Sequence, residues 1–485
     1  MKSPKKEARI PNGLEIIGML LVFTAIMLLS IMVFEIPVAM ALILVWTFMI
    51  LFGLYLGNNY DSLQEGIQEG ISKGLQGVLI LITVGALIGT WIIGGIVPTL
   101  IYYGTNFIHP SIFLFAAMIL CMVTSIATGT SWGTLGTAGI AMMGVAQSFG
   151  IPLPLAAGAL ISGAFMGDKI SPLSDTTVLT SSLSNVDIIK HIKSMFYVTI
   201  PAFVITSILF IIVGFFYVDG SVSMVQAEET QAALQEFFNI QWYMLIPALI
   251  VIVLLMMKKP SVPTIAFGAL LGSIWAVLFQ EKSINESFMA IYEGYSAESN
   301  YLIINELLNR GGIMFMLDVI LIILLALGLG GLMDKIGILQ VLTNIMSSWI
   351  NKRKGRLTTA TMSTALFGTA FGGSTYVGII TGSKITEKNY EEMKIDKTVL
   401  SRNTEAGATV TSPLFPWVDG GVFVSAVLGV STLSYLPFAW YNLLVIFISI
   451  VYGYTGLFMW NTNEVNQTDN EMQNVTEETE KVNIN

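Results

Sequence analysis

The segment Gly167–Thr177 carries the residue types and the spacing best suited to chemistry. It reads GDKISPLSDTT, lies between two long apolar runs, and contains Asp168, Lys169 and Asp175. A charged group at the centre of a bilayer costs on the order of 3 kcal/mol, so such groups usually line an ion or substrate path. Pro172 lacks a backbone N–H and breaks a helix, and a broken helix at membrane depth is tolerated where it lines a cavity. We therefore predict a binding site built on an unwound helix.

The composition places this segment in a membrane. The chain has 485 residues, of which 54% are apolar and 11% are charged, whereas a soluble domain carries about 25% charged residues. The net charge of −9 gives no reason to expect a nucleic-acid partner. A single cysteine excludes an intramolecular disulfide, and the two histidines do not have the spacing of zinc ligands. We expect an all-α polytopic membrane protein and no enzyme.

Apolar runs of about 20 residues predict the spanning helices. The expected spans are Leu14–Phe34, Ile36–Leu56, Val78–Val97, Met195–Val218, Tyr243–Met257, Ile265–Phe279, Ile313–Leu332 and Trp440–Met459. Two regions rich in glycine and threonine, Ser111–Thr180 and Thr358–Val430, interrupt this series. We expect re-entrant hairpins and broken helices there, because plain crossings would leave the lysines of the second region outside the cell.

Basic loops mark the cytoplasmic side of a membrane protein. The basic segments are the N-terminus, Lys190–Lys193, Lys258–Lys259, Lys352–Arg356 and Lys384–Arg402. The segment Asp219–Gln241 has acidic residues and no basic one, so we expect it outside. These assignments predict a cytoplasmic N-terminus and opposite orientations for corresponding pieces of the two halves.

The two halves also repeat a pair of motifs. Ser131 lies in a Gly/Ser/Thr cluster with Trp132, and Ser374 lies in a similar cluster at 372–377. Pro172 in Ser-Pro-Leu follows Ser131 by 41 positions (172 − 131), and Pro413 in a second Ser-Pro-Leu follows Ser374 by 39 (413 − 374). We predict an inverted repeat, the architecture of many secondary transporters. Its parts are a first repeat at 1–218 broken near 167–177, an external linker at 219–241, a second repeat at 242–460 broken near 403–417, and an acidic disordered tail at 461–485.

The oxygen-bearing side chains near the two breaks could hold a sodium ion, because a desolvated sodium ion needs several oxygen ligands. The candidate ion-binding residues are Thr130, Ser131, Thr134, Asp168, Ser174, Asp175, Thr176 and Thr177 in the first half, and Ser374, Thr375, Asn403, Thr404, Glu405 and Thr409 in the second. For the sodium ion itself we predict Asp175, Thr176, Asn403 and Thr404. A carboxylate among them could bind a proton or a sodium ion but not both, which is the minimal device for antiport.

Structural roles compete with these functional ones. Asp168 could pair with Lys169, Glu405 could pair with Arg402 three residues before it, and Asp419 could merely end a helix. Trp132 could simply pack. The run Gly129–Gly133 matches the G-x-S-x-G elbow of serine hydrolases, but the expected context is a membrane helix, and His109 and His191 are expected near opposite faces. These features argue against an intramembrane hydrolase.

Three segments together resemble the NhaC-type sodium/proton antiporters of bacteria. These are TGTSWGTLGT at 128–137, GDKISPLSDTT at 167–177 and GTWIIGGIVPTLIYYG at 89–104. That family belongs to the ion transporter superfamily, whose relatives include dicarboxylate and citrate carriers. The resemblance implies inverted repeats, hairpins, broken helices and often homodimers. The second-half segment Asn403–Glu405 matches the family more loosely.

The resemblance implies a sodium/proton antiporter of the bacterial plasma membrane. Its partners would be sodium ions, protons and the lipid bilayer, and no cofactor is expected. The alternative is a sodium- and proton-coupled carboxylate exchanger, because some NhaC-like proteins exchange malate for lactate. In that case Arg402 or Lys169 would hold the organic anion, since a carboxylate needs a cation or a helix N-terminus. A passive channel is a third class, disfavoured by the repeated breaks.

Overall fold

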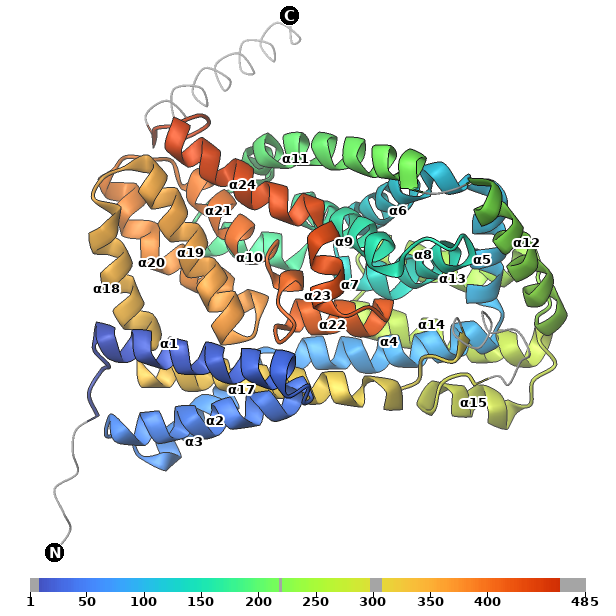
Figure 1. Ribbon diagram of the computed structural model, residues 1–485, viewed down its shortest axis with the longest axis horizontal. Helices are drawn as coiled ribbons and strands as arrows, with labels where there is room; N and C mark the ends of the chain where they lie inside the picture. The colour runs from blue at the N-terminus through green and yellow to red at the C-terminus, as the bar shows by residue number, and fades with distance from the viewer. Residues whose placement is uncertain (1–7, 218–219, 297–307, 463–485) are drawn as a thin grey trace, which may run out of the picture.

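The computed structural model describes residues 8–217, 220–296 and 308–462, and it is built from helices (Figure 1). Within these ranges the sole β contact is an isolated bridge between Ile395 and Asn461. In the described part of the chain, five helices are long and apolar enough to cross a membrane, and the number rises to as many as eight if each sharply bent helix pair counts as one span. The prediction of an all-α polytopic membrane protein is confirmed. The predicted tail lies almost entirely outside the described residues.

The α-helices follow one another along the whole described chain. They are α1 (Gly13–Leu28), α2 (Val38–Tyr55), α3 (Tyr60–Lys73), α4 (Leu75–Ile93), α5 (Ile96–Phe107), α6 (Phe113–Thr128), α7 (Ser131–Thr134), α8 (Ile140–Ser148), α9 (Leu153–Ile170), α10 (Asp175–Leu183), α11 (Ile188–Tyr217), α12 (Gly220–Phe237), α13 (Ile246–Met256), α14 (Ser261–Phe279), α15 (Ile284–Tyr292), α17 (Leu317–Ile336), α18 (Ile338–Ile350), α19 (Lys354–Gly372), α20 (Thr375–Glu392), α21 (Lys397–Gly407), α22 (Asp419–Leu428), α23 (Thr432–Tyr435) and α24 (Trp440–Thr455). Figure 1 shows α1, α2, α3 and α17 running along one edge of the molecule, where α2 contacts the other three.

One expected span is divided. The run Val78–Val97 was expected as a single helix, but α4 ends at Ile93 and α5 begins at Ile96. Gly95 between them has φ +74°, a left-handed conformation that residues with a Cβ rarely adopt. The prediction of one continuous span was wrong here, because the Gly94-Gly95 pair turns the chain.

The helix α11, the longest of those described, is continuous although it contains an internal proline. Pro201 cannot donate a hydrogen bond to the carbonyl of Tyr197, four residues earlier. The hydroxyl of Tyr452 on α24 donates to that carbonyl instead, at 3.2 Å. The contact ties α11 to α24 at the point where the proline weakens the helix.

Two helical hairpins share one local design. The helix α6 ends at Gly129 (φ +70°), and the side chain of Thr130 caps the next helix by accepting from the N–H of Gly133. The helix α19 ends at Gly373 (φ +68°), and the side chain of Ser374 caps α20 by accepting from the N–H of Tyr376. A left-handed glycine followed by a hydroxyl cap ends one helix and starts another within two residues. The recurring clusters seen in the sequence are therefore the tips of two helical hairpins.

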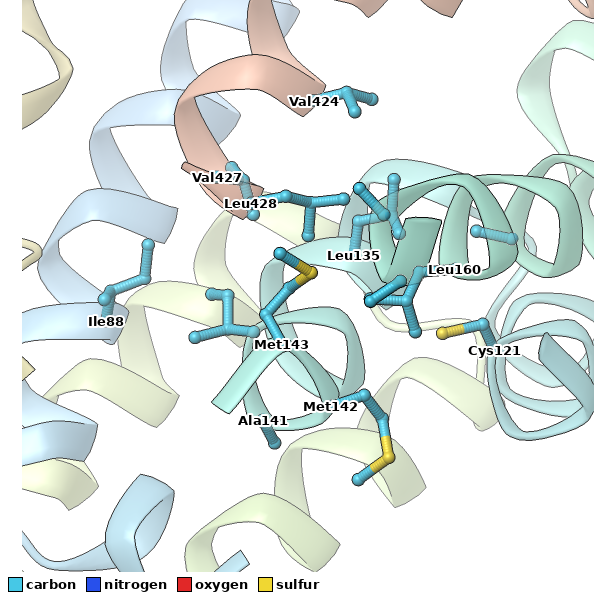
Figure 2. Packing of buried hydrophobic residues seen from close by; sticks show 14 of the residues in the cluster. Ile88, Cys121, Leu135, Ala141, Met142, Met143, Leu160, Val424, Val427 and Leu428 are labelled. Atoms are coloured by element: carbon cyan, nitrogen blue, oxygen red, sulfur yellow. The ribbon is translucent and has the colours of Figure 1, made fainter. Parts of the chain in front are cut away.

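The two predicted breaks are present as breaks in helices. The first separates α9 from α10 at residues 171–174, and the second separates α21 from α22 at 408–418. The short helix after each break packs into the other half of the chain, because α10 contacts α20 and α21, whereas α22 contacts α8 and the π-helical turn Leu135–Gly139. In Figure 2, Leu428 of α22 lies among Leu135, Met143 and Leu160 of the first half. The division into repeats with an external linker is not tested and stays a prediction.

Two basic segments predicted to be cytoplasmic lie together. A surface cleft of about 580 Å³ is lined by Asn185 and Lys190 on one side and by Lys394 and Lys397 on the other. Segments that share one cleft must face the same side of the membrane. This agrees with the common side predicted for Lys190–Lys193 and Lys384–Arg402.

Candidate ion-binding site

Four helix N-termini converge on one cavity. Ser131, Asp175, Thr375 and Asp419 are the first residues of α7, α10, α20 and α22, and all four line it. Helix N-termini carry unsatisfied N–H groups and a partial positive charge that favours anionic groups. The cavity measures about 60 Å³, which is room for an ion and a few water molecules. Its lining also includes Gly74, Gly77, Ile80, Thr130, Trp132, Phe165, Asp168, Thr176, Ile323, Leu327, Tyr376 and Thr409.

Two of the three cavity aspartates are buried and are held in equivalent ways. Asp168 is 4% exposed, and its Oδ2 accepts a hydrogen bond from the hydroxyl of Ser131 at 2.8 Å. Asp419 is 6% exposed and accepts from the hydroxyl of Thr375 at 3.1 Å. Ser131 and Thr375 occupy the same position, the first residue after the hairpin tip. In each half, a hairpin hydroxyl therefore fixes a carboxylate of the broken helix.

The remaining oxygens of these two carboxylates differ. Asp419 also accepts from the N–H of Thr375 at 3.1 Å, from Ser412 at 3.2 Å and from the N–H of Gly420 at 2.7 Å. In contrast, Oδ1 of Asp168 is buried without a hydrogen-bond partner. A buried carboxylate oxygen without a donor is costly unless a cation or water satisfies it. Asp168 therefore offers a free acceptor to an ion in the cavity, whereas Asp419 is largely satisfied by the protein.

Asp175 is the exposed acid of the site and joins the two halves. Its carboxylate accepts hydrogen bonds from the N–H of Thr176 and from the hydroxyl of Tyr376. Tyr376 belongs to α20 in the second half, at the position that Trp132 occupies in the first. Trp132 stacks on Phe423 of α22, with ring centroids 4.3 Å apart. Each aromatic residue thus reaches the broken helix of the opposite half, one through a ring and one through a hydroxyl.

Only part of the predicted ligand set comes together at this cavity. Thr130, Ser131, Asp168, Asp175, Thr176, Thr375 and Thr409 line it, and Ser174 and Ser374 cap two of the helices that start there. Thr134, Thr177, Asn403, Thr404 and Glu405 are not among the lining residues. The amide of Asn403 donates instead to the hydroxyl of Tyr390 at 3.0 Å. The four residues predicted to share one sodium ion are thus divided, with Asp175 and Thr176 in the cavity.

Glu405 belongs to a separate buried cluster. Its Oε2 accepts from the hydroxyl of Thr180 at 2.5 Å, whereas its Oε1 and the ammonium of Lys169 have no hydrogen-bond partner. Lys169 lies within electrostatic range of Glu405. Arg402 donates to the carbonyl of Phe458 at 3.0 Å. Among the described residues, neither the Asp168–Lys169 pair nor the Arg402–Glu405 pair forms an ion pair.

Two polar residues of the cavity lining were not expected there. Tyr376 was not among the candidates from the sequence, and Asp419 was considered only as the end of a helix, whereas it is the first residue of α22. Thr409 was a candidate, and it lines the cavity. A signal was present, because Asp175 and Asp419 both follow a Ser-Pro-Leu motif and both start a short helix. The second interval is longer, at seven residues from Ser412 (419 − 412) against four from Ser171 (175 − 171), and this hid the correspondence.

The hydrolase alternative finds no support in the geometry. The hydroxyl of Ser131 donates to Asp168 rather than to a histidine. His191 shares a hydrogen bond with Ser401 at 2.8 Å, and His109 accepts from the N–H of Ser111. The described residues also contain no group of three histidine, cysteine or acidic side chains that could hold a metal.

The model of the Na+/H+ antiporter family matches residues 13–192 and 163–457 of this chain. The chain belongs to this family. It is 50% identical over 457 residues to the Malate-2H(+)/Na(+)-lactate antiporter of Bacillus subtilis (strain 168), covering 94% of this chain and 97% of that protein. It is 34% identical over 454 residues to the Na(+)/H(+) antiporter NhaC of Alkalihalophilus pseudofirmus, covering 93% and 97%. The predicted resemblance to the NhaC-type proteins is confirmed.

The names of the similar proteins differ in the substrates that they mention. The chain is 33% identical over 409 residues to the Arginine/ornithine antiporter ArcD of Halobacterium salinarum, covering 83% of this chain and 84% of that protein. Membership of the family identifies the chain as a multi-pass membrane transporter of the antiporter type. Because these names differ, the substrates that this chain exchanges have to be inferred from the residues of the cavity and its surroundings.

Proposed function

We propose that the protein exchanges sodium ions for protons across a bacterial plasma membrane, with the cavity between the two breaks as its ion site. The observation that carries this proposal is the set of Asp168, Asp175 and Asp419 around about 60 Å³ of space. Carboxylates and hydroxyls are the oxygen ligands that a small hard cation prefers. No lysine or arginine of the described chain lines the cavity, so its charge suits a cation.

The helix N-termini make this acidic site compatible with a low-dielectric environment. Asp175 and Asp419 stand at the first positions of α10 and α22, where the backbone favours negative charge. An ion that enters would meet Asp175 first, since this residue is exposed, and would then reach the free Oδ1 of Asp168. Protons that bind the same carboxylates would compete with sodium, which links the two fluxes.

A carboxylate-coupled exchange is the second candidate function, and one observation favours it. The relative that is 50% identical over nearly its whole length is named for malate, lactate, sodium and protons. Such an exchange would need a cationic place for the organic anion near the ion cavity. A cytoplasmic N-terminus and a homodimer are further proposals, which rest on the basic loops and on the family resemblance.

Purified protein in proteoliposomes tests the main proposal. An imposed sodium gradient should drive proton movement, followed with a pH-sensitive dye in liposomes that contain no organic acid. The Asp175→Asn protein, reconstituted at the same density, is the matched control and should show no sodium-driven signal. Proton movement that begins only when malate or lactate is added would replace the antiporter by the exchanger.

A further inference from the structure

A second hollow opens beside the ion cavity. It has a volume of about 340 Å³ and shares Ile80, Thr130 and Asp175 with the cavity. We call this hollow the vestibule. Its outer wall is the connection between α13 and α14, which contributes Lys258 and Lys259. Asp175 therefore stands at the boundary between two compartments, the small ion cavity and the larger vestibule.

The two compartments have opposite electrostatic character. The charged residues that line the cavity are Asp168, Asp175 and Asp419, whereas those that line the vestibule are Asp175, Lys258 and Lys259. A cation at Asp175 would neutralise the one acid of the vestibule and leave two lysines facing the space. Opposite charges at close range attract strongly in such partly enclosed sites. The vestibule would then attract an anion, and it would do so most strongly after the cation has bound.

Polar groups suited to a small hydroxy acid surround the lysines. Thr128, Thr130 and Ser261 line the vestibule and carry hydroxyls. Ser261 is also the first residue of α14, a helix of 19 residues, so free N–H groups and a positive helix end lie at the same wall. Pockets that hold small organic ligands typically begin at about 300 Å³. The vestibule has the size and the chemistry for a small organic carboxylate.

The cations considered from the sequence alone are less suitable. Arg402 is engaged by the carbonyl of Phe458, and its guanidinium lies 5.3 Å from the ring centroid of Trp460. Lys169 is fully buried beside Glu405. Neither residue lines the cavity or the vestibule. In contrast, both vestibule lysines are exposed and line the vestibule.

We propose that the vestibule is a binding site for a small organic carboxylate, which Lys258 and Lys259 hold next to a sodium ion at Asp175. This inference rests on the proposed sodium site. The carboxylate would be recognised by the two ammonium groups, and its hydroxyl by the threonine and serine side chains. Binding would depend on sodium, because the bare carboxylate of Asp175 repels the organic anion.

Charge removal at the two lysines tests the proposal. In proteoliposomes with sodium present, the Lys258→Gln/Lys259→Gln protein should take up labelled malate with an apparent affinity at least about tenfold weaker than the wild type. The Lys258→Arg/Lys259→Arg protein should stay within about threefold of the wild type, because it keeps both charges. The control is Lys352→Gln/Arg353→Gln, which removes two charges from another exposed basic loop and should leave malate uptake unchanged.

A labelling experiment on unmodified protein keeps the proposal testable if the glutamine variant does not fold. Malate with sodium should slow the reaction of Lys258 and Lys259 with an amine-specific reagent, read by mass spectrometry, and should not protect Lys352.

Equal malate affinity in the glutamine variant, or no protection of the two lysines, overturns the inference. A wild type that moves protons on a sodium gradient but neither binds nor transports malate or lactate overturns the inference alone. A wild type that moves no protons with or without these acids overturns the sodium site as well.

Discussion

The break between α9 and α10 and the break between α21 and α22 use the same parts but hold their aspartates differently. Both follow a hairpin tip made of a left-handed glycine and a hydroxyl cap, and both are followed by a short helix that starts with an aspartate. In the second half, Asp419 accepts hydrogen bonds from Thr375, Ser412 and Gly420 of its own half. In the first half, Asp175 is exposed and its side-chain donor, Tyr376, comes from the opposite half.

This difference indicates that the two breaks have different roles, one in ion binding and one in holding the fold together. A carboxylate surrounded by fixed donors has little capacity left for an ion and chiefly stabilises the fold. A carboxylate that is open to the vestibule and has one side-chain donor can give up that hydrogen bond and bind a cation instead. The first break would therefore supply the exchangeable ligand, and the second break would supply the rigid wall against which the ion is held.

Replacing each aspartate in turn by asparagine separates the roles of Asp175 and Asp419 directly. The Asp175→Asn protein should lose sodium-driven proton flux and keep wild-type thermal stability, because few of the contacts of Asp175 are buried. The Asp419→Asn protein should lose stability by about 3 kcal/mol, since hydrogen bonds to a charged acceptor contribute about 1.5–3 kcal/mol each and the new amide would place N–H groups opposite existing donors. Flux in liposomes and thermal unfolding in detergent measure the two quantities.

Loss of stability in the Asp175→Asn protein, or full stability in the Asp419→Asn protein, would contradict these different roles of the two aspartates. Equal loss of flux in both would not distinguish the two roles, so the unfolding temperatures decide the comparison.

The two pseudo-equivalent aromatic residues provide a second, smaller contrast. The Tyr376→Phe protein loses the hydroxyl that orients Asp175, so the apparent sodium affinity should weaken by about tenfold with little change in the maximal rate. The Trp132→Phe protein keeps an aromatic ring against Phe423 and should change sodium affinity less than threefold. The concentration dependence of sodium-driven flux gives both parameters. An unchanged sodium affinity in the Tyr376→Phe protein would assign the tyrosine a packing role.

A contact between the halves outside the cavity should affect stability. The Thr180→Val protein loses the 2.5 Å hydrogen bond to buried Glu405, and leaving that carboxylate oxygen without a donor should cost about 1–3 kcal/mol. The matched control is Thr206→Val, since Thr206 is equally buried and its hydroxyl has no hydrogen-bond partner. Thermal unfolding in detergent should show a lower midpoint for the first variant and an unchanged or higher midpoint for the second.

The orientation of the two halves gives the last prediction. In a Cys121→Ser background, single cysteines at Lys190 and at Lys394 should both resist an impermeant thiol reagent added to intact cells, because the two positions line one cleft and basic segments face the cytoplasm. A cysteine at Glu229 should react. Labelling of position 394 from outside would overturn the cytoplasmic assignment, and opposite results at 190 and 394 would contradict the shared cleft.

Local chemistry explains which features could be predicted from the sequence. Pro172 and Pro413 lack an N–H, and the clusters around Ser131 and Ser374 supply glycines and helix caps, so the breaks and hairpin tips are visible in short stretches of chain. The Gly94-Gly95 pair that divides a predicted span was also visible, although hydropathy alone joined the two helices.

The contacts that complete the site could not be predicted in this way. Tyr376 and Asp175 are 201 positions apart, and Thr180 and Glu405 are 225 apart. Such contacts depend on how α10 and α22 each insert into the opposite half, which local patterns do not specify. The division of the predicted ligand set, with Asn403 turned toward Tyr390, has the same origin.

The cavity at the two breaks should bind sodium through Asp175, independently of transport. Isothermal titration of sodium into purified protein, with choline as the balancing cation, measures this without any transport step. We predict a saturable heat of sodium binding for the wild type and none for the folded Asp175→Asn protein. Saturable sodium binding of equal affinity in the variant, or no sodium binding by the wild type, would contradict a sodium site at Asp175.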